Sequence, residues 1–302
     1  GAKLEQSLGG VDTLFKDSSS VVKANAASAF KTAGLSANEY MEQITSFSAS
    51  LIGSLSGDTA KAATVADMAM GDMSDNANKF GTDMESIQNA YQGFAKQNYT
   101  MLDNLKLGYG GTKEEMQRLL QDAQKLTGTE YNIDNLSDVY NAIHAVQNQL
   151  GVTGTTAKEA SETFSGSFSA MKAAAQNLLG NMAIGGDVTG SMQSLVDTAS
   201  TFLFNNAIPM IGRVLSSLPG AIKSGIKSAG PKIKAAGGEI VKSLKAGIKG
   251  ILPSSMGGLV TSVFDGLLPK IGPAFGKITS GLGSMLKTAS PYLVSFGEAV
   301  IS

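Results

Sequence analysis

This chain contains no cysteine and no tryptophan, and its single histidine is His144. Without cysteine, disulfides, thiol catalysis and cysteine-ligated zinc are excluded. A metal site made of several histidines is excluded as well, and any histidine-based catalytic pair or triad would have to be built around His144. Aromatic residues make up only 6% of the chain and 36 residues are glycine, so the large side chains that usually dominate a core are scarce.

His144 lies on the flank of an apolar stripe in a helix that we predict over 136–150. Its nearest polar neighbours along that helix are Gln147 and Asn148, and neither completes a catalytic or metal-binding group. Packing or exposure to solvent is therefore the favoured interpretation of this residue. We expect a chain that is not an enzyme, with no catalytic residues, no cofactor and no bound metal.

Charge and proline divide the chain near residue 205. Residues 1–200 carry 13 basic and 22 acidic residues, a net charge of −9, whereas residues 201–302 carry 11 basic and 3 acidic residues, a net charge of +8. All seven prolines lie between Pro209 and Pro291. We predict a helical region over 1–205 and a basic, Gly/Pro-rich region over 206–302. The start, GAKLEQSLGG, shows no initiator Met and no signal peptide, so we expect a fragment or a processed product.

The proline-free region predicts one helix after another. In a capping box, a Ser or Thr and a Glu three residues later satisfy the free amides of a helix start. Four pairs match this pattern: Ser36 with Glu39, Thr82 with Glu85, Thr112 with Glu115, and Thr156 with Glu159. Apolar residues follow each pair at helical spacing, and the last of these stripes runs from Ala160 to Met171. The predicted fold class is all-α, an elongated series of helices with a Gly/Pro-broken amphipathic helical C-terminal region.

Two glycines and two polar segments complete the predictions for this region. Gly128 and Gly151 are expected to end the helices before them. The acidic residues over 58–85 lack the alternating spacing of a calcium loop, so we expect a solvated acidic face. The stretch GYGGTK at 108–113 lacks the Gly-Lys-Ser/Thr ending of a phosphate-binding loop, so we interpret it as a turn between helices.

Residues 221–252 combine lysines with apolar residues, mostly isoleucine, that keep near one helical face. A basic amphipathic helix of this kind favours an anionic membrane surface or a partner groove. Its glycines and the Gly230-Pro231 step weaken it, so we expect it to be helical only when something supports it. The residues predicted to contact a membrane or another anionic surface are Lys223, Lys227, Lys232, Lys234, Lys242, Lys245 and Lys249.

A single membrane span is not expected in this half of the chain. The longest charge-free runs, 198–212 and 250–264, have 15 residues each, whereas a spanning helix needs about 20. Nonspecific contact with DNA stays open as another explanation of the lysines, although aromatic residues for base stacking and clustered arginines are missing.

Residues 34–128 include the motif YTMLDNLKLGYGGTKEEMQRLL, and residues 143–179 include GTTAKEASET. These two stretches of the helical region resemble the tail tape measure proteins of long, noncontractile-tailed phages and prophages of Gram-positive bacteria. With a weaker match over 180–220, the resemblance covers a little over half of the chain. Full tape measure proteins are usually much longer, so this chain would measure only part of a tail.

The resemblance implies a structural role in the virion. Tape measure proteins lie extended and helical inside the tail tube, and their length sets the tail length because the tube polymerises around them. On infection they leave ahead of the DNA, and their apolar parts help it through the membrane. The implied partners are the tail tube protein, tail assembly chaperones, other copies of the chain and the host membrane. The implied locations are the tail tube lumen, the host cytoplasm during assembly, and the host cell membrane on infection.

The alternative is a membrane-active, pore-forming or toxin-like helical protein whose lysine-rich part permeabilises bilayers by itself. Some tape measure proteins carry peptidoglycan hydrolases. We see none in this chain, because metal-dependent endopeptidases need histidine ligands and cysteine endopeptidases need cysteine.

Overall fold

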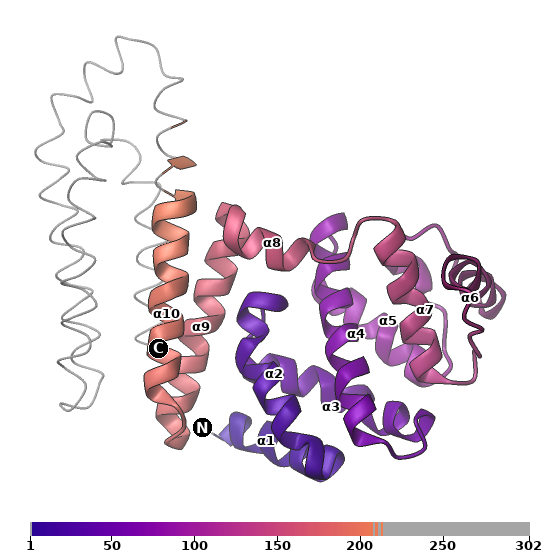
Figure 1. Ribbon diagram of the computed structural model, residues 1–302, viewed down its shortest axis with the longest axis horizontal. Helices are drawn as coiled ribbons and strands as arrows, with labels where there is room; N and C mark the ends of the chain where they lie inside the picture. The colour runs from indigo at the N-terminus through magenta and orange to yellow at the C-terminus, as the bar shows by residue number, and fades with distance from the viewer. Residues whose placement is uncertain (1, 208, 211–212, 214–302) are drawn as a thin grey trace, which may run out of the picture. The chain divides into compact units, whose positions relative to one another are not determined.

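The structure, a computed structural model, describes residues 2–207, 209, 210 and 213, and this part of the chain forms helices without any β-strand (Figure 1). The predicted all-α class is confirmed. The elements in chain order are α1 (Ala2–Phe15), the 3-10 turn η1 (Lys16–Ser18), α2 (Ser19–Thr32), α3 (Ala37–Ser54), α4 (Thr59–Phe80), α5 (Met84–Ala95), the 3-10 turn η2 (Leu102–Leu105), α6 (Lys113–Thr127), α7 (Leu136–Gln149), α8 (Thr155–Glu162), α9 (Phe164–Ile184), α10 (Val188–Ser200) and the π-helical turn η3 (Thr201–Ala207).

The chain divides into two compact units. Unit 1 contains residues 1–160 and 180–186, and unit 2 contains residues 161–179 and 187–302. Helices α1 to α7 of unit 1 share one core, whereas the elongated arrangement expected for the whole chain and the boundary expected near residue 205 stay predictions.

Helices α3 and α4 lie at the centre of unit 1. α3 contacts α1, α2, α4, α5 and α7, and α4 in turn contacts α2, α5 and α7. One cluster of buried apolar residues extends from Val11 in α1 to Val146 in α7. Because removal of apolar surface from water is the main force that favours folding, this shared core makes helices α1 to α7 depend on one another.

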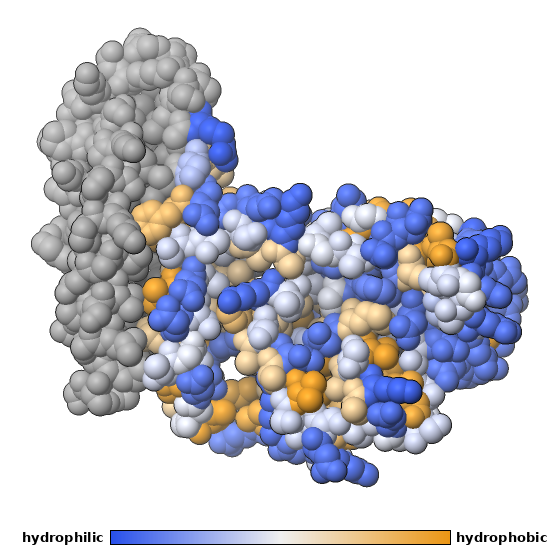
Figure 2. Space-filling model, viewed as in Figure 1, coloured by the Kyte–Doolittle hydropathy of each residue, from blue (hydrophilic) through white to orange (hydrophobic). Residues whose placement is uncertain are grey.

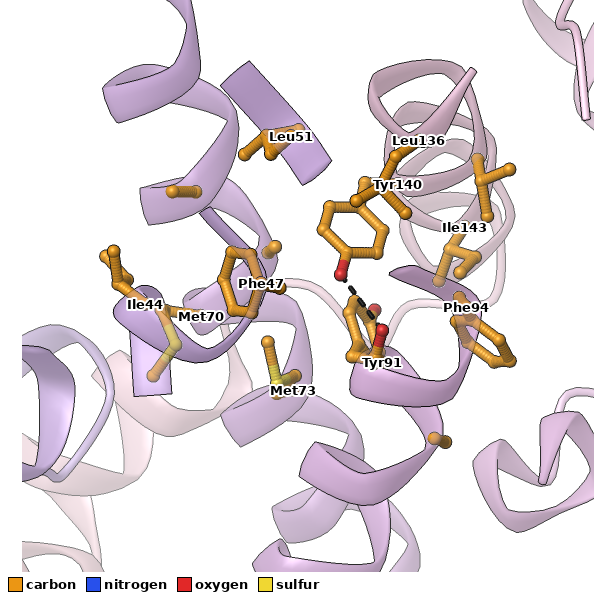
Figure 3. Packing of buried hydrophobic residues seen from close by; sticks show 14 of the residues in the cluster. Ile44, Phe47, Leu51, Met70, Met73, Tyr91, Phe94, Leu136, Tyr140 and Ile143 are labelled. Atoms are coloured by element: carbon orange, nitrogen blue, oxygen red, sulfur yellow. Dashed lines mark hydrogen bonds between the residues drawn. The ribbon is translucent and has the colours of Figure 1, made fainter. Parts of the chain in front are cut away.

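Aromatic rings occupy the middle of the core (Figure 3). The Tyr140 ring of α7 packs edge-on against Phe47 of α3, with ring centroids 5.5 Å apart, and lies 5.1 Å from the Tyr91 ring of α5. The Tyr140 hydroxyl donates to the Tyr91 carbonyl at 3.0 Å. Three helices therefore meet through three rings, although aromatic residues are scarce in the chain.

Two of the four predicted capping pairs are found at helix starts. Ser36 is the N-cap of α3, where the Glu39 amide donates to its hydroxyl at 3.3 Å and the Ser36 amide donates to the Glu39 carboxylate at 2.8 Å. Thr112 caps α6 by accepting a hydrogen bond from the Glu115 amide at 3.2 Å. The Glu115 carboxylate, however, pairs with Arg118, so only half of this box is confirmed.

The other two predicted pairs are wrong. α5 starts one residue later than expected, with Asp83 as its N-cap, so Thr82 lies outside the helix. α8 starts at Thr155, so Thr156 lies inside the first turn, and the Thr156 amide donates to Asp75 of α4. The amides at the start of α8 thus use an acceptor from another helix.

The predicted helix ends are confirmed at two glycines. Gly128 and Gly151 both have positive φ, of 73° and 69°, and follow α6 and α7. The last leucine of each predicted stripe does not reach the core, because Leu126 is 46% exposed and Leu150 is 51% exposed. Leu126 lies in the last turn of α6, and Leu150 is the residue that follows α7.

In the described part of unit 2, the start of α9 packs on the π-helical turn. Phe164 and Phe168 of α9 lie 5.0 and 5.4 Å from the Phe202 ring, and the Asn206 side chain donates to the Ser161 carbonyl at 3.1 Å. The stripe predicted to continue from α8 into this region is interrupted, because α8 ends at 162 and α9 begins at 164.

The basic region predicted over 206–302 lies almost entirely outside the described residues. In the described part of the chain, no helix combines the length and the apolar character that crossing a membrane requires.

Candidate functional site around His144

The end of α4 buries carboxylates inside unit 1. Asp72 is 2% exposed and Asp75 is 5% exposed, and a buried charge is costly unless it is paired or hydrogen-bonded. The predicted solvated acidic face is therefore wrong for these two residues, because partners from distant parts of the chain cover them. Asp58, Asp83 and Glu85 are exposed as expected.

His144 of α7 contacts the buried Asp72 carboxylate. The Nδ1 atom of His144 lies 2.9 and 3.0 Å from the two carboxylate oxygens, and the His144 side chain is 36% exposed. Burial raises the pKa of Asp72 to about 6, although the hydrogen bond with His144 opposes this rise. The same hydrogen bond raises the pKa of His144 above its ordinary value of 6.5, against the effect of burial. Each group therefore holds its proton more tightly in the folded chain.

Two buried amide side chains connect the same part of α4 to α7 and η2. The Gln147 Nε2 atom donates to the Asp72 carbonyl at 3.1 Å. The Asn76 Nδ2 atom donates to Gln147 Oε1 at 2.7 Å and to the Leu105 carbonyl at 2.9 Å. Both amides are 0% exposed, and such continuous buried networks hold elements in one register because every broken bond is costly.

The Asp75 carboxylate caps the start of α8. One of its oxygens accepts from the Gly154 amide at 2.7 Å, and the other accepts from the Thr156 amide at 2.8 Å. The Thr155 hydroxyl donates to the main-chain carbonyl of Asp75 at 3.2 Å. Because the first amides of a helix lack partners within it and carry partial positive charge, a carboxylate is the matching acceptor.

Among the described residues, some buried polar atoms close to this network have no protein partner. They include the Tyr91 hydroxyl and Asn76 Oδ1. Burial, followed by the charge of Asp72, raises the pKa of Tyr91 well above its ordinary value of 10, so its hydroxyl remains a protonated donor without an acceptor. An unpaired buried polar group costs about 1–3 kcal/mol.

The contacts of this network can hold side chains, including the His144 imidazole, in fixed orientations. A carboxylate that holds Nδ1 of a histidine orients the imidazole, as in catalytic triads, but catalysis also needs a nucleophile or substrate at the other ring nitrogen. In the described residues the hydrogen bonds of His144 go to Asp72, and no group of three or more His, Asp or Glu side chains is placed to hold a metal. The contacts of Asp72 and Asp75 connect α4 with α7 and α8.

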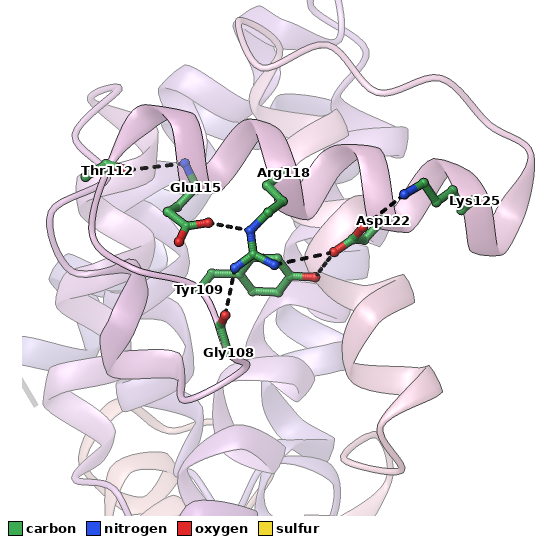
Figure 4. A network of polar contacts seen from close by, with 7 residues as sticks. All are labelled: Gly108, Tyr109, Thr112, Glu115, Arg118, Asp122 and Lys125. Atoms are coloured by element: carbon green, nitrogen blue, oxygen red, sulfur yellow. Dashed lines mark hydrogen bonds and ion pairs between the residues drawn. The ribbon is translucent and has the colours of Figure 1, made fainter.

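A second polar network covers the outer side of α6 (Figure 4). The Arg118 guanidinium lies 4.3 Å from the Tyr109 ring centre, and it donates to the Glu115 carboxylate at 2.5 Å and to the Gly108 carbonyl at 2.8 Å. The Tyr109 hydroxyl donates to Asp122 at 2.7 Å. These contacts hold GYGGTK against α6, where the surface is mostly hydrophilic (Figure 2), and confirm its interpretation as a turn between helices.

The partners of His144 were not among the residues predicted to lie near it. The available signal is the spacing of Asp72, Asp75 and Asn76, which places three polar side chains on one side of α4. That side continues the apolar stripe that contains Ala69 and Met73, so it faces the core. Polar residues within an apolar stripe indicate a buried network, whereas acidic residues opposite the stripe indicate a solvated face.

The seven lysines predicted to contact an anionic surface, from Lys223 to Lys249, all lie outside the described residues, so this contact stays a prediction. No family model, no curated protein and no solved structure matches the chain.

Proposed function

We propose that this chain is part of a tail tape measure protein of a phage or prophage of Gram-positive bacteria with a long, noncontractile tail. The observation that carries the proposal is the sequence resemblance of residues 34–128 and 143–179 to that family. The block YTMLDNLKLGYGGTKEEMQRLL runs through η2 into α6, and GTTAKEASET covers α8 and its capped start. The specific parts of the resemblance therefore coincide with segments that make the tertiary contacts described above.

The packing of unit 1 determines how such a chain would measure length. An α-helix advances about 1.5 Å per residue, so 160 residues in one unbroken helix would span about 240 Å. The longest described helix, α4, has 22 residues, or about 33 Å, and the helices of unit 1 fold back onto a shared core. In the proposed function, unit 1 is a folded module and longer helical parts of the parent protein supply most of the measured length.

The proposal is tested in the genome that encodes the parent protein. A stop codon at the start of this region should abolish tails of normal length, because the tube would polymerise around a truncated ruler. An in-frame deletion of residues 1–160 should shorten the tails by much less than about 240 Å, because it removes a folded module. Tail lengths are measured by electron microscopy of purified particles.

Tails of unchanged number and length with the stop codon would contradict the proposed function. Shortening by about 240 Å in the deletion would leave the ruler role intact but would mean that unit 1 is extended inside the tail. A synonymous substitution at the stop-codon position is the matched control, since it leaves the protein unchanged.

The lysine and isoleucine pattern over 221–252 favours a second candidate, a membrane-active protein. In this case the chain itself permeabilises bilayers, without other tail proteins. Release of a trapped dye from vesicles with anionic lipids, caused by the full chain and lost when the seven lysines are replaced by glutamine, would favour this candidate. The absence of release would contradict it.

A further inference from the structure

The short helix α8 carries the chain out of unit 1, and it contributes little apolar surface to the core. Of its eight residues only Thr156 is buried. The nearest apolar anchor before the helix is Val152, which is 0% exposed. A helix of this length has little stability of its own in water, so its position depends on tertiary contacts such as those at its start.

These contacts converge on the end of α4. The Asp75 carboxylate accepts hydrogen bonds from the amides of Gly154 and Thr156, at 2.7 and 2.8 Å, and the Asp75 carbonyl accepts from the Thr155 hydroxyl at 3.2 Å. Close by, the Asn78 side chain donates to the Thr156 hydroxyl at 2.8 Å. Because Asp75 is 5% exposed, the two charge-assisted bonds form largely out of contact with water, where they are strong.

We propose that residues 153–160 form a strap that Asp75 fastens to unit 1, and that this strap detaches as one piece while the rest of unit 1 stays folded. Detachment breaks the bonds to Asp75 and the bond between Asn78 and Thr156 but exposes little apolar surface, so it costs less free energy than opening of the core. When fully extended, these eight residues span at most about 26 Å. The inference concerns the fold alone and does not depend on the proposed tail function.

Hydrogen exchange of the full 302-residue chain, followed by mass spectrometry, tests the strap. In the wild type, amides of residues 157–160 should exchange at least about tenfold faster than the core amides of α3 and α7, after correction for intrinsic rates.

The variant Asp75→Asn keeps the shape of the side chain but places an amide donor against one of the two backbone amides. It should speed exchange in the strap by about tenfold to a hundredfold and leave α3 and α7 unchanged. Trypsin cleavage at the exposed Lys158 should accelerate by a similar factor.

The matched control is Asp58→Asn, the same change at the exposed N-cap of α4, where the side chain accepts from the Lys61 amide at 3.0 Å. This variant should leave exchange in the strap unchanged. Equal exchange of strap and core in the wild type would overturn the proposal. So would acceleration of the core by Asp75→Asn to the same extent as the strap, because Asp75 would then support the whole unit, and so would an equal effect of Asp58→Asn on the strap.

Discussion

Tyr140 and Tyr91 pack ring against ring in the core of unit 1, but their hydroxyls have different surroundings. The Tyr140 hydroxyl donates to the Tyr91 carbonyl at 3.0 Å, whereas the Tyr91 hydroxyl is buried without a protein partner. A buried hydrogen bond contributes about 0.5–1.5 kcal/mol to stability, whereas an unpaired buried hydroxyl is a net cost. The same substitution should therefore have different effects at the two positions.

We predict that Tyr140→Phe lowers the free energy of unfolding by about 1 kcal/mol, because it removes this bond and leaves a buried carbonyl with one partner fewer. Tyr91→Phe should leave the free energy unchanged or raise it, because it removes an unpaired hydroxyl. Urea denaturation of both variants, followed by circular dichroism, measures the difference. An equal loss at Tyr91 would mean that a buried water binds its hydroxyl.

The Asp72 and His144 pair should make unit 1 less stable as the pH rises. The pKa of Asp72 is about 6 in the folded chain against an ordinary value of 3.8, so its stabilising contribution is complete below pH 3.8 and is lost as the pH rises through about 6. The pKa of His144 is raised above 6.5, so its contribution is complete below pH 6.5 and is lost as the pH rises through the raised value. In both windows the folded chain binds more protons than the unfolded chain, and stability falls with pH.

The variant Asp72→Asn tests this prediction, because it removes the buried charge together with the partner that raises the pKa of His144. The difference in unfolding free energy between wild type and variant, measured from about pH 5 to about pH 8, isolates the pair from the other carboxylates. The wild type should lose stability relative to the variant as the pH rises. Parallel curves for the two proteins would contradict the prediction.

At the scale of elements, the helix starts differ in whether the capping partner is close in the sequence or far from it. Ser36 and Glu39 satisfy each other's amides within one turn, so four residues of sequence contain the whole interaction. The start of α8 is capped by Asp75, which lies 79 residues before Gly154. A sequence motif of a few residues cannot identify a partner at that distance along the chain. The sequence therefore predicts features that depend on neighbouring residues, such as the all-α class, the apolar stripes and the helix ends at glycine. It does not predict the contact of His144 with Asp72, because the two residues are far apart in the sequence.

Two matched substitutions test the local caps. Ser36→Ala should lower the free energy of unfolding by about 1 kcal/mol, because it removes the hydroxyl that accepts from the Glu39 amide. Thr82→Ala, at a position where the same motif failed, should be neutral or stabilising, because the buried Thr82 hydroxyl has no partner. Thermal denaturation of both variants gives the comparison. A loss at Thr82 equal to that at Ser36 would show that Thr82 supports the start of α5 after all.

At the scale of the molecule, the shared core of unit 1 should make helices α1 to α7 unfold together. Ile44 of α3 is 0% exposed and belongs to the same cluster as residues of α7, so a cavity at this position weakens packing that several helices share. We predict that Ile44→Ala lowers the free energy of unfolding by about 2–5 kcal/mol. Hydrogen exchange should accelerate by one common factor in α3 and α7, because both are exposed by the same opening. The control is Val21→Ala, at a residue that is 47% exposed, and it should have little effect. Acceleration confined to α3 would mean that the helices of unit 1 open separately, and a single cooperative core would then be the wrong description of this unit.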